Sequence, residues 1–416
     1  MKKDVIIIGA GISGLAAAIH LQNKGRKVFL IEASERPGGR IKTDLHQGFR
    51  LDRGFQVLLT AYPEAQKILD FEALNLQKML PGAHVLFDGG SFEVSDPFRR
   101  PSALFSTLFA PVGSLKDKLL TFLLKKNLQK LSIDEIFNQP ESTSIERIKQ
   151  YGFSSKMLNR FYAPFMSGIY LENKLQTSSR IFDFVMKMFS EGDAAIPALG
   201  MEEIPKQMAS KLPEDCFLFN QKVVDIIDNK VYTEDGNCFE ASQVLIATNA
   251  DELSQRFFPK QNNEKQQVTN VYFEASEAPI KKAIVVLNAS EKRKWVTNLT
   301  VISNVSADYA PEGKVLISVS CNGILDVEDE KIAENMKKEL LSWLGDTVLN
   351  WKMLKTYKIQ YALPNQNSVL NDLKSSDIQM TESLFICGDH LLNGSINAAL
   401  KTGRIAAETM MLNREK

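Results

Sequence analysis

The 416-residue sequence is poor in the residues that crosslink small secreted domains or hold metal ions. It has four cysteines and four histidines, and the cysteines form no C-x-x-C pair. Neither a disulfide framework nor a zinc site is indicated, so we expect no metal centre. Such cysteine usage is typical of a reducing compartment, and we expect a cytoplasmic protein. The cysteines are Cys216, Cys238, Cys321 and Cys387.

The sequence also lacks an excess of charge of either sign. Fifty Lys and Arg residues balance fifty Asp and Glu residues, which argues against the strongly basic character of nucleic-acid-binding proteins. With 23 glycines and 15 prolines, the chain is too poor in both for a collagen-like or low-complexity protein. The composition is that of a globular protein, and the length predicts two large or three small domains.

No apolar run is long enough to cross a membrane. The apolar stretch of residues 5–21 is interrupted by Gly9, Gly11 and Gly14, and it falls short of the ~20 residues that a spanning helix needs. Asp4 at its start also argues against a signal peptide. We expect at most peripheral membrane contact.

What the sequence does have is a βαβ pattern near its start. Residues 5–8 form an apolar run of strand length, residues 13–24 have the composition of a helix that Gly25 ends, and residues 27–32 resemble a second strand. This order of elements predicts a parallel sheet with helices on its faces.

A glycine motif, Gly9-Ala10-Gly11-Ile12-Ser13-Gly14, lies between the first strand and the helix. Gly9 permits the tight turn, Gly11 lets a pyrophosphate approach the backbone, and Gly14 allows the helix to pack closely on the strand. Glu32, at the end of the second strand, would accept hydrogen bonds from ribose hydroxyls and repel a 2′-phosphate, which disfavours NADP. The pattern predicts a dinucleotide site with the phosphates at the helix N-terminus.

A second glycine pair follows the second strand, in Arg36-Pro37-Gly38-Gly39-Arg40. Adjacent glycines let the backbone approach a second part of a cofactor, and Arg36 or Arg40 can offset phosphate charge. This addition favours FAD over NAD.

The rest of the chain alternates between helical and strand-rich regions. Residues from about 63 to 207 show helical spacing of leucine and phenylalanine, with a capping box at Thr143 and Glu146. Residues 223–247 have strand character with a turn at Asp235-Gly236, and residues 268–321 suggest a broad antiparallel sheet. Helices are predicted at residues 332–344 and 397–411, the second after a buried strand near residues 384–387.

Several motifs together resemble those of the flavin amine oxidase superfamily, which includes protoporphyrinogen oxidases and phytoene desaturases. They are residues 32–40, 51–55, 163–170 and 361–364, and the closing motif of residues 387–389, 394–399 and 403. The resemblance implies an α/β plus α+β fold, in which a discontinuous Rossmann-like FAD-binding domain with a parallel sheet joins a substrate domain of antiparallel sheet and a helical lobe. The implied FAD-binding parts are residues 1–65, 205–262 and 375–416, the helical lobe is residues 66–204, and the substrate sheet is residues 263–374.

The resemblance also implies how this chain would hold FAD. The backbone at Val223 would meet adenine, Thr248 would lie near the nucleotide half, and Asp389 would accept from the ribityl chain. Gly54-Phe55-Gln56 would pass close to the flavin, and a helix starting near Asn397 would aim its amides at the flavin ring. The expected cofactor-binding residues are Gly9, Ala10, Gly11, Ile12, Ser13, Gly14, Glu32, Ala33, Arg36, Gly38, Gly39, Arg40, Gly54, Phe55, Gln56, Val223, Thr248, Gly388, Asp389, Ser395, Ile396 and Asn397.

Two departures from the family pattern bear on the chemistry. Monoamine oxidases carry a cysteine bonded to the flavin shortly before the closing motif, whereas this sequence has none between Cys321 and Cys387, so we expect noncovalent FAD. Amine oxidases also place a lysine in the strand that corresponds to residues 267–273, which here contains none, and this disfavours amine oxidation. No catalytic acid or base is assigned, because His390 is better explained as a loop residue.

With the resemblance, the sequence predicts an FAD-dependent oxidoreductase that takes a hydride from a lipophilic or polycyclic small molecule to flavin N5. Oxygen, quinone or another acceptor would reoxidise the flavin. The alternatives are an amine oxidase, a non-redox flavin isomerase, and an FAD-free protein that binds lipidated proteins, as the similar Rab GDP-dissociation inhibitors do.

One stretch, residues 98–130, mixes Phe105, Phe109 and Phe122 with five lysines. Such a stretch suits an interfacial helix or the mouth of an apolar tunnel, but a core-facing helix with a solvated basic face explains it better. The lysines are Lys116, Lys118, Lys125, Lys126 and Lys130.

Overall fold

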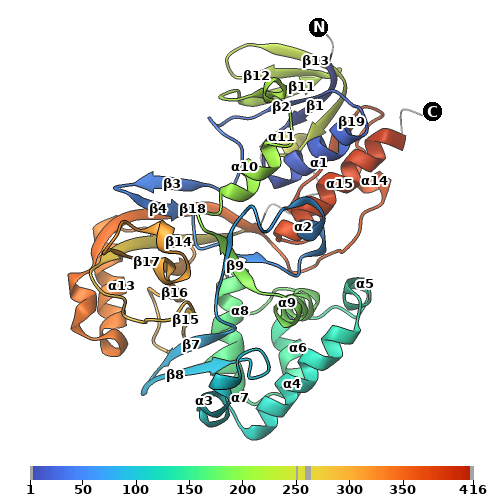
Figure 1. Ribbon diagram of the computed structural model, residues 1–416. Coiled ribbons are helices and arrows are strands. Elements are labelled where there is room, and N and C mark those ends of the chain that lie inside the picture. Colours follow the sequence, from blue (N-terminus) through green and yellow to red (C-terminus); the bar gives the residue numbers. More distant parts are fainter. Residues whose placement is uncertain (1–2, 250–251, 258–263, 413–416) are drawn as a thin grey trace.

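The computed structural model describes residues 3–249, 252–257 and 264–412. Figure 1 shows a first sheet at the top, a second sheet at the lower left and a group of helices at the lower right. Two helices from opposite ends of the chain, α1 (Ile12–Asn23) and α15 (Ile396–Leu412), lie together beside the first sheet. The molecule is therefore a mixed α/β structure with parallel and antiparallel strands.

The core of the first sheet is parallel, as the βαβ pattern predicts. Strand β1 pairs with β2 on one side and with β13 on the other, with Ile6 opposite Phe29 and Val244. The last parts of the central strands, residues 5–8 of β1 and 244–246 of β13, are apolar and buried because both faces of the sheet are covered there. The parallel strands, in spatial order, are β10 (Phe217–Leu218), β2 (Val28–Ile31), β1 (Lys3–Ile8), β13 (Cys238–Ile246) and β19 (Leu384–Ile386).

An antiparallel meander extends this sheet. Strands β11 (Val223–Ile227) and β12 (Lys230–Thr233) pair with each other, and β12 pairs with the first part of β13. The predicted turn is present, with Gly236 at a φ of 86°. The predicted strands and turn in this region are thus confirmed.

Helices α1 and α15 approach each other closely because the contact is made by small residues. A Cβ atom added to Gly403 on α15 would lie 2.2 Å from the carbonyl oxygen of Ser13. A Cβ atom on Gly14 would lie 2.1 Å from the carbonyl oxygen of Gly9. The glycines fix the distance between the two helices and the β1–α1 turn.

The second sheet is mixed, which corrects the prediction of a purely antiparallel one. Strand β15 pairs in parallel with β7, and β7 and β8 lie inside the stretch expected to be helical. The leucine and phenylalanine spacing of the helices that follow obscured this short hairpin, although buried and less buried residues alternate along residues 82–85 of β7. In spatial order the strands are β18 (Lys352–Pro364), β14 (Lys265–Ala275), β17 (Val315–Asn322), β16 (Asn298–Val301), β15 (Val285–Asn288), β7 (Gly82–Phe87) and β8 (Gly90–Ser95).

Short strands connect the two sheets. Strands β3 (Thr43–His46) and β4 (Phe49–Asp52) form a hairpin between them in Figure 1. A small antiparallel sheet joins the helical region to the remainder of the molecule. Two of its strands, β6 and β9, also lie within residues 66–204, which were expected to be helical. Its members are β5 (Leu58–Leu59), β9 (Ala194–Pro197) and β6 (Leu76–Lys78).

The helical region lies next to β7 and β8 (Figure 1). The predicted capping box is confirmed, since Thr143 accepts from the Glu146 amide and Glu146 accepts from the Thr143 amide. The helices within residues 63–209 are α2 (Pro63–Ile68), α3 (Leu104–Phe109), α4 (Leu115–Lys130), α5 (Ile133–Phe137), α6 (Ser144–Gln150), α7 (Ser155–Met157), α8 (Ala163–Tyr170), α9 (Ser179–Glu191) and α10 (Glu203–Ala209).

The remaining helices are α11 (Glu252–Phe257), α12 (Ile302–Val305), α13 (Asp329–Leu344) and α14 (Ser375–Ile378). Helix α13 packs on one face of the second sheet. Among the described residues, no helix is both long enough and apolar enough to span a membrane.

Candidate active site

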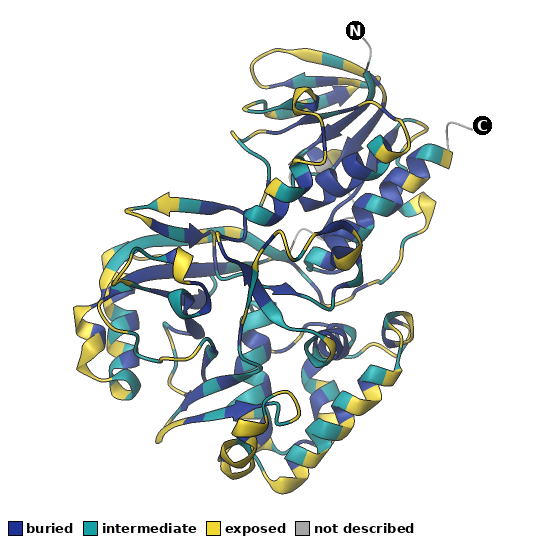
Figure 2. Ribbon diagram, viewed as in Figure 1, coloured by how far each residue is buried: buried dark blue, intermediate teal, exposed yellow. Residues whose placement is uncertain are grey.

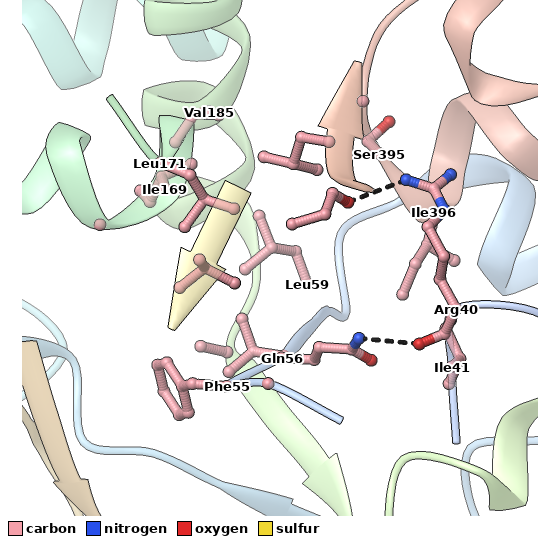
Figure 3. Close-up of a pocket in the computed structure, with 18 of the residues that line it drawn as sticks. Arg40, Ile41, Phe55, Gln56, Leu59, Ile169, Leu171, Val185, Ser395 and Ile396 are labelled. Carbon is pink, nitrogen blue, oxygen red and sulfur yellow. Dashed lines mark hydrogen bonds between the residues drawn. The ribbon is translucent and has the colours of Figure 1, made fainter. Parts of the chain in front are cut away.

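One cavity of about 1250 Å³ connects the first sheet to the helical region. One end is lined by the turn between β1 and α1, and the other end by α8, α9 and the second sheet. Figure 3 shows a part of it, with Ile169, Leu171 and Val185 on one side and Arg40, Ser395 and Ile396 on the other. The two glycine motifs and the apolar helices therefore face one continuous space.

The β1–α1 turn forms a backbone cradle at the first end. Gly9 has a φ of 103°, and a Cβ atom there would lie 2.9 Å from the Ala247 carbonyl oxygen. Gly11 is the N-cap of α1, and no described side chain caps that helix end, so its first amides remain available to an anion. A Cβ atom on Gly39 would lie 3.2 Å from the Gly11 Cα, so the two glycine motifs meet here. This cradle fits the pyrophosphate of a dinucleotide.

Glu32 lines the same end of the cavity. One carboxylate oxygen accepts from the Ala10 amide at 2.8 Å, and the other accepts from the Ser34 amide at 3.0 Å and the Ser34 hydroxyl at 2.6 Å. These donors fix the carboxylate at the end of β2 and leave part of its accepting capacity open. Glu32 thus lines the cavity at the end of β2, and its contact with a ribose stays a prediction.

Arg40 and Asp389 join the second glycine motif to the closing motif. An Arg40 Nη atom lies 2.5 Å from an Asp389 carboxylate oxygen, and the other Nη donates to the Ala362 carbonyl at 2.9 Å. Burial alone would lower the pKa of Arg40, but the Asp389 carboxylate raises it above its ordinary value. In Figure 3 the Gln56 side-chain amide donates to the Arg40 carbonyl, at 3.2 Å. The pair places one positive and one negative group on the cavity wall.

Most of the predicted cofactor-binding residues line this one cavity, although they come from six separate parts of the chain. These residues are Gly9, Gly11, Ile12, Ser13, Glu32, Ala33, Gly38, Gly39, Arg40, Gly54, Phe55, Gln56, Val223, Thr248, Gly388, Asp389, Ser395 and Ile396.

Four predicted residues do not line it. Ala10 and Gly14 are packed beneath the turn, where they serve the strand and helix rather than the cavity. Arg36 forms ion pairs with Asp44, at 3.0 Å, and with Glu202, so these carboxylates hold it away from the cavity. The side-chain oxygen Oδ1 of Asn397 accepts from the Glu64 backbone amide at 3.0 Å, which turns the Asn397 side chain toward α2.

His390 also lies outside the lining, in a short 3-10 turn formed by Asp389–Leu391. Its ring packs over Gly388, where an added Cβ atom would lie 2.2 Å from the ring. Gly388 has a φ of 158°, which residues with a side chain rarely adopt, so both the ring and the dihedral angle favour glycine at this position.

Asp52, in the family-like motif after β3, is a structural residue rather than a cavity residue. It accepts from the Tyr309 hydroxyl at 2.8 Å, the Thr43 hydroxyl at 2.5 Å and the Met201 amide at 3.0 Å. Its backbone carbonyl accepts from the Tyr272 hydroxyl at 2.9 Å. Complete burial raises the pKa of Asp52 to about 6 despite these donors. The residue therefore ties β4 to the second sheet.

The sequence analysis assigned no side chains to the substrate side of the cavity. Its helical wall is apolar and its sheet floor carries polar side chains. Phe165 and Ile169 lie in the family-like motif of residues 163–170, and the other residues follow no motif. The wall includes Phe161, Phe165, Ile169, Leu171, Val185 and Phe189, and the floor includes Val268, Leu287, Asn298, Ser320 and Tyr357.

The model of one family, described as flavin-containing amine oxidoreductase, matches residues 12–411. The chain belongs to this family. Its members are flavin-containing oxidoreductases, so the predicted class of enzyme and the predicted flavin are supported, as is the resemblance drawn from the motifs.

Known relatives agree with this membership. Protoporphyrinogen oxidase 2 of Arabidopsis thaliana is 27% identical over 170 residues, which is 40% of this chain and 32% of that protein. Phytoene desaturase of Fusarium fujikuroi is 35% identical over 102 residues, which is 23% of this chain and 18% of that protein. The alignments thus span a third or less of these relatives.

Putrescine oxidase bound to putrescine has the same overall fold. Its structure superimposes with a TM-score of 0.67 and 16% identity, covering 99% of both chains. At this identity the likeness concerns the fold and carries no information on the substrate of this chain.

Proposed function

We propose that this protein is an FAD-dependent oxidoreductase that removes a hydride from a lipophilic small molecule. The observation that carries the proposal is the single cavity, in which a backbone cradle for a dinucleotide opens directly onto an apolar wall. Bound FAD would accept the hydride at N5 and pass the electrons to oxygen, quinone or another acceptor. The protein's own part is to hold the reacting C–H bond in place and to keep water out.

The residues present fit FAD rather than a shorter nucleotide. The cradle of Gly9, Gly11 and Gly39 would hold the pyrophosphate, and Glu32 would accept from the ribose. Asp389 would accept from the ribityl chain, while Arg40 offsets charge beside it. Ser395 and Ile396 line the cavity at the start of α15, whose N-terminal amides would face the flavin ring. The carbonyl oxygen of the Gln56 side chain is buried without a hydrogen-bond partner among the described residues, so it can accept from a bound molecule.

We propose that the FAD is noncovalent. No cysteine is among the described residues that line the cavity. Cys387, next to the closing motif, is completely buried, and burial raises the pKa of its thiol far above the ordinary value. A thiol in that state is a poor nucleophile toward a flavin.

The helical wall favours an apolar substrate. Phe161 stacks on Phe165, with ring centroids 5.4 Å apart, and Phe165 contacts Phe189 at 5.3 Å. All three rings line the cavity. Such a wall binds through removal of apolar surface from water, which suits a lipophilic or polycyclic molecule.

We also propose that the protein touches a lipid surface through α3 and α4. Figure 2 shows exposed residues along both helices. The interpretation of residues 98–130 as a core-facing helix with a solvated basic face holds only in part, because apolar as well as basic side chains are exposed. Helix α4 buries Leu124 and Leu128 but exposes several other leucines, and Phe109 on α3 is 78% exposed. The exposed apolar residues, here called the α3–α4 patch, are Leu104, Phe105, Leu108, Phe109, Leu115, Leu119 and Leu123.

The α3–α4 patch has the charge that anionic lipids attract. Lys116, Lys126 and Lys130 are exposed on α4, while Asp117 is buried in the capping box of that helix. Lys118 and Phe122 of α4 line the cavity, so the cavity reaches the helix that carries the patch. An apolar molecule dissolved in a lipid layer would then have a short path to the active site.

The visible spectrum of the purified protein tests the main proposal. We expect absorbance near 450 nm, typical of oxidised flavin. Acid or heat precipitation should release the colour into the supernatant as FAD, and candidate lipophilic substrates should bleach it in the absence of oxygen. Colour that stays with the pellet would contradict noncovalent binding.

The same experiment separates the alternatives. Bleaching by primary amines alone would indicate an amine oxidase, and conversion of a substrate without reduction of an acceptor would indicate an isomerase. A protein that stays colourless after incubation with FAD would contradict the proposal and favour the lipid-binding alternative.

A further inference from the structure

A row of polar side chains crosses the second sheet where it forms the cavity floor. Asn270 on β14 lies opposite Tyr357 on β18 and Ser320 on β17, and Ser320 lies opposite Asn298 on β16. Directly opposed residues in adjacent strands share one face of a sheet. Ser320, Asn298 and Tyr357 line the cavity, so this face is the one turned toward the substrate space.

The other face of the same strands is apolar. Val271, Val319 and Leu299 occupy the neighbouring row and pack with Met336 of α13 in one hydrophobic cluster. Both faces of the sheet are buried. An apolar row on the cavity face would therefore stabilise the protein as well as the apolar row on the α13 face does. Buried polar groups are unfavourable unless they are hydrogen-bonded, so the polar row is not explained by folding stability.

Hydrogen bonds within the row leave acceptors and donors directed to the cavity. The hydroxyls of Ser318 and Ser320 both donate to the side-chain oxygen Oδ1 of Asn270, at 3.0 and 2.7 Å. Because the Ser320 proton is used in this way, the Ser320 oxygen is left to accept from another molecule. Asn270 thus sets the orientation of the Ser320 hydroxyl.

Asn298 lines the cavity and has unused hydrogen-bonding capacity. Its side chain is only 5% exposed, and within the described part of the chain it makes no hydrogen bond. The facing residue of α8 is Gly168, and a Cβ atom there would lie 2.5 Å from the Asn298 side-chain nitrogen. The glycine leaves space for an amide that can both donate and accept.

Further unpartnered polar atoms lie on the strands and helix around this row. Among the described residues, the Asn270 side-chain nitrogen, the Ser167 hydroxyl and the Thr300 hydroxyl are buried without a hydrogen-bond partner. Thr300 lies opposite Ser318, and Ser167 precedes Gly168 on α8. A buried group without a partner destabilises a protein, and such groups are typical of places where a ligand or water completes the bonding.

We infer that Ser320 and Asn298 form a subsite for a neutral substituent that both donates and accepts hydrogen bonds, such as a hydroxyl or a carboxamide. The inference deepens the proposed function, because it specifies the polar part of an otherwise apolar substrate. The donor of that substituent bonds to the Ser320 oxygen, and its acceptor bonds to the Asn298 amide. Neither residue is charged, nor are Asn270 and Tyr357 beside them.

The charged groups that contact Tyr357 are Asp44, which accepts from its hydroxyl at 2.8 Å, and Lys355, whose Nζ lies 4.8 Å from the centroid of its ring. They are paired with each other at 3.4 Å, so a carboxylate or an ammonium group would have to compete with that pair for a counter-charge.

A matched set of naphthalene derivatives tests this inference by equilibrium dialysis against the purified protein. The set is naphthalene, 2-naphthalenemethanol, 2-naphthoate and protonated 2-(aminomethyl)naphthalene. We expect the alcohol to bind about tenfold more tightly than naphthalene, and both ions to bind more weakly than the alcohol. Equal binding of alcohol and naphthalene, tightest binding of either ion, or no binding of any member would each overturn the inference.

Variants locate the effect. Asn298→Leu and Ser320→Ala should each bring the alcohol to within about twofold of naphthalene while leaving the naphthalene affinity unchanged. Cys321→Ala, the next residue on the opposite face, should keep the tenfold preference. An equal loss in Cys321→Ala would assign the effect to general damage of the sheet and contradict the subsite.

The result is separable from that of the flavin experiment. A yellow protein that reduces with apolar compounds but shows no preference for the alcohol would overturn the subsite alone. A colourless protein with the preference would overturn the proposed function alone, since dialysis measures binding without turnover.

Discussion

The two ends of the cavity are built in different ways. At the nucleotide end, the surface is largely backbone, made by Gly9, Gly11 and Gly39, which lie within 31 residues of one another in the sequence. At the substrate end, the surface consists of side chains from segments far apart, such as Phe165 on α8 and Ser320 on β17. A backbone surface is damaged by adding atoms, whereas a side-chain surface is damaged by removing or changing them.

The largest effects are expected at the glycines, where the fold and the nucleotide site can be separated. Gly14→Ala should destabilise the protein by about 3 kcal/mol or more, because its Cβ would lie 2.1 Å from the Gly9 carbonyl oxygen. Gly11→Ala should fold, because the nearest atom to its Cβ is the Gly39 Cα at 3.9 Å, but it should weaken FAD binding on the order of 100-fold. Thermal unfolding and flavin titration measure the two effects. Normal FAD affinity of the Gly11→Ala variant would contradict our proposal that the pyrophosphate binds at this cradle.

The next largest effect on stability and flavin binding is expected at the ion pair of Arg40 and Asp389, which lines the cavity. Arg40→Met leaves Asp389, whose side chain is 8% exposed, without its partner, and we expect a loss of about 2 kcal/mol in the free energy of unfolding. Flavin content should fall as well. The double variant Arg40→Met/Asp389→Asn should recover part of the stability but none of the flavin. Recovery of both would show that the pair has only a structural role.

A pH-dependent effect is expected at Asp52, which ties β4 to the floor sheet. Its pKa is raised to about 6 in the folded protein from an ordinary 3.8, so the folded state favours the protonated form. The stabilising contribution is complete below about pH 4 and is lost as the pH rises through 6. Relative to Asp52→Asn, the wild type should lose about 2 kcal/mol of unfolding free energy between pH 4 and 7. Denaturant titrations at several pH values measure this difference, and a constant difference would contradict the raised pKa.

The smallest effect on the cavity is expected at the α3–α4 patch. Phe105→Ser/Phe109→Ser should change the free energy of unfolding by less than about 0.5 kcal/mol, because both rings are exposed. Flavin binding should not change. Co-sedimentation with phosphatidylcholine vesicles containing phosphatidylglycerol should be lost, whereas Leu45→Ser, an exposed site on β3, should keep it. Absence of sedimentation by the wild type would overturn the lipid contact.

Much of the nucleotide end could be predicted from the sequence. The βαβ unit, the meander after Val223 and the final helix all form where their patterns place them, because hydrophobic periodicity and glycine positions act locally. Arg36 and Asn397 were exceptions. Whether an arginine faces a cavity depends on which carboxylates lie near it. For Arg36 these are the carboxylates of Asp44 and Glu202, and Glu202 is distant from Arg36 in the sequence.

The substrate end could not be predicted in the same way. Nothing in the sequence sets Asn298 opposite Ser320, or Gly168 against Asn298, since these contacts arise only when β16, β17 and α8 come together. The exposure of Phe105 and Phe109 is also a tertiary property, because a helix with apolar residues can turn any side to the core. The sequence by itself determined the glycine cradle and the strands around it, because backbone dihedral angles and short-range spacing decide them. Only the tertiary structure decided the floor, the wall and the exposed patch, because these are made by side chains that meet across long distances in the chain.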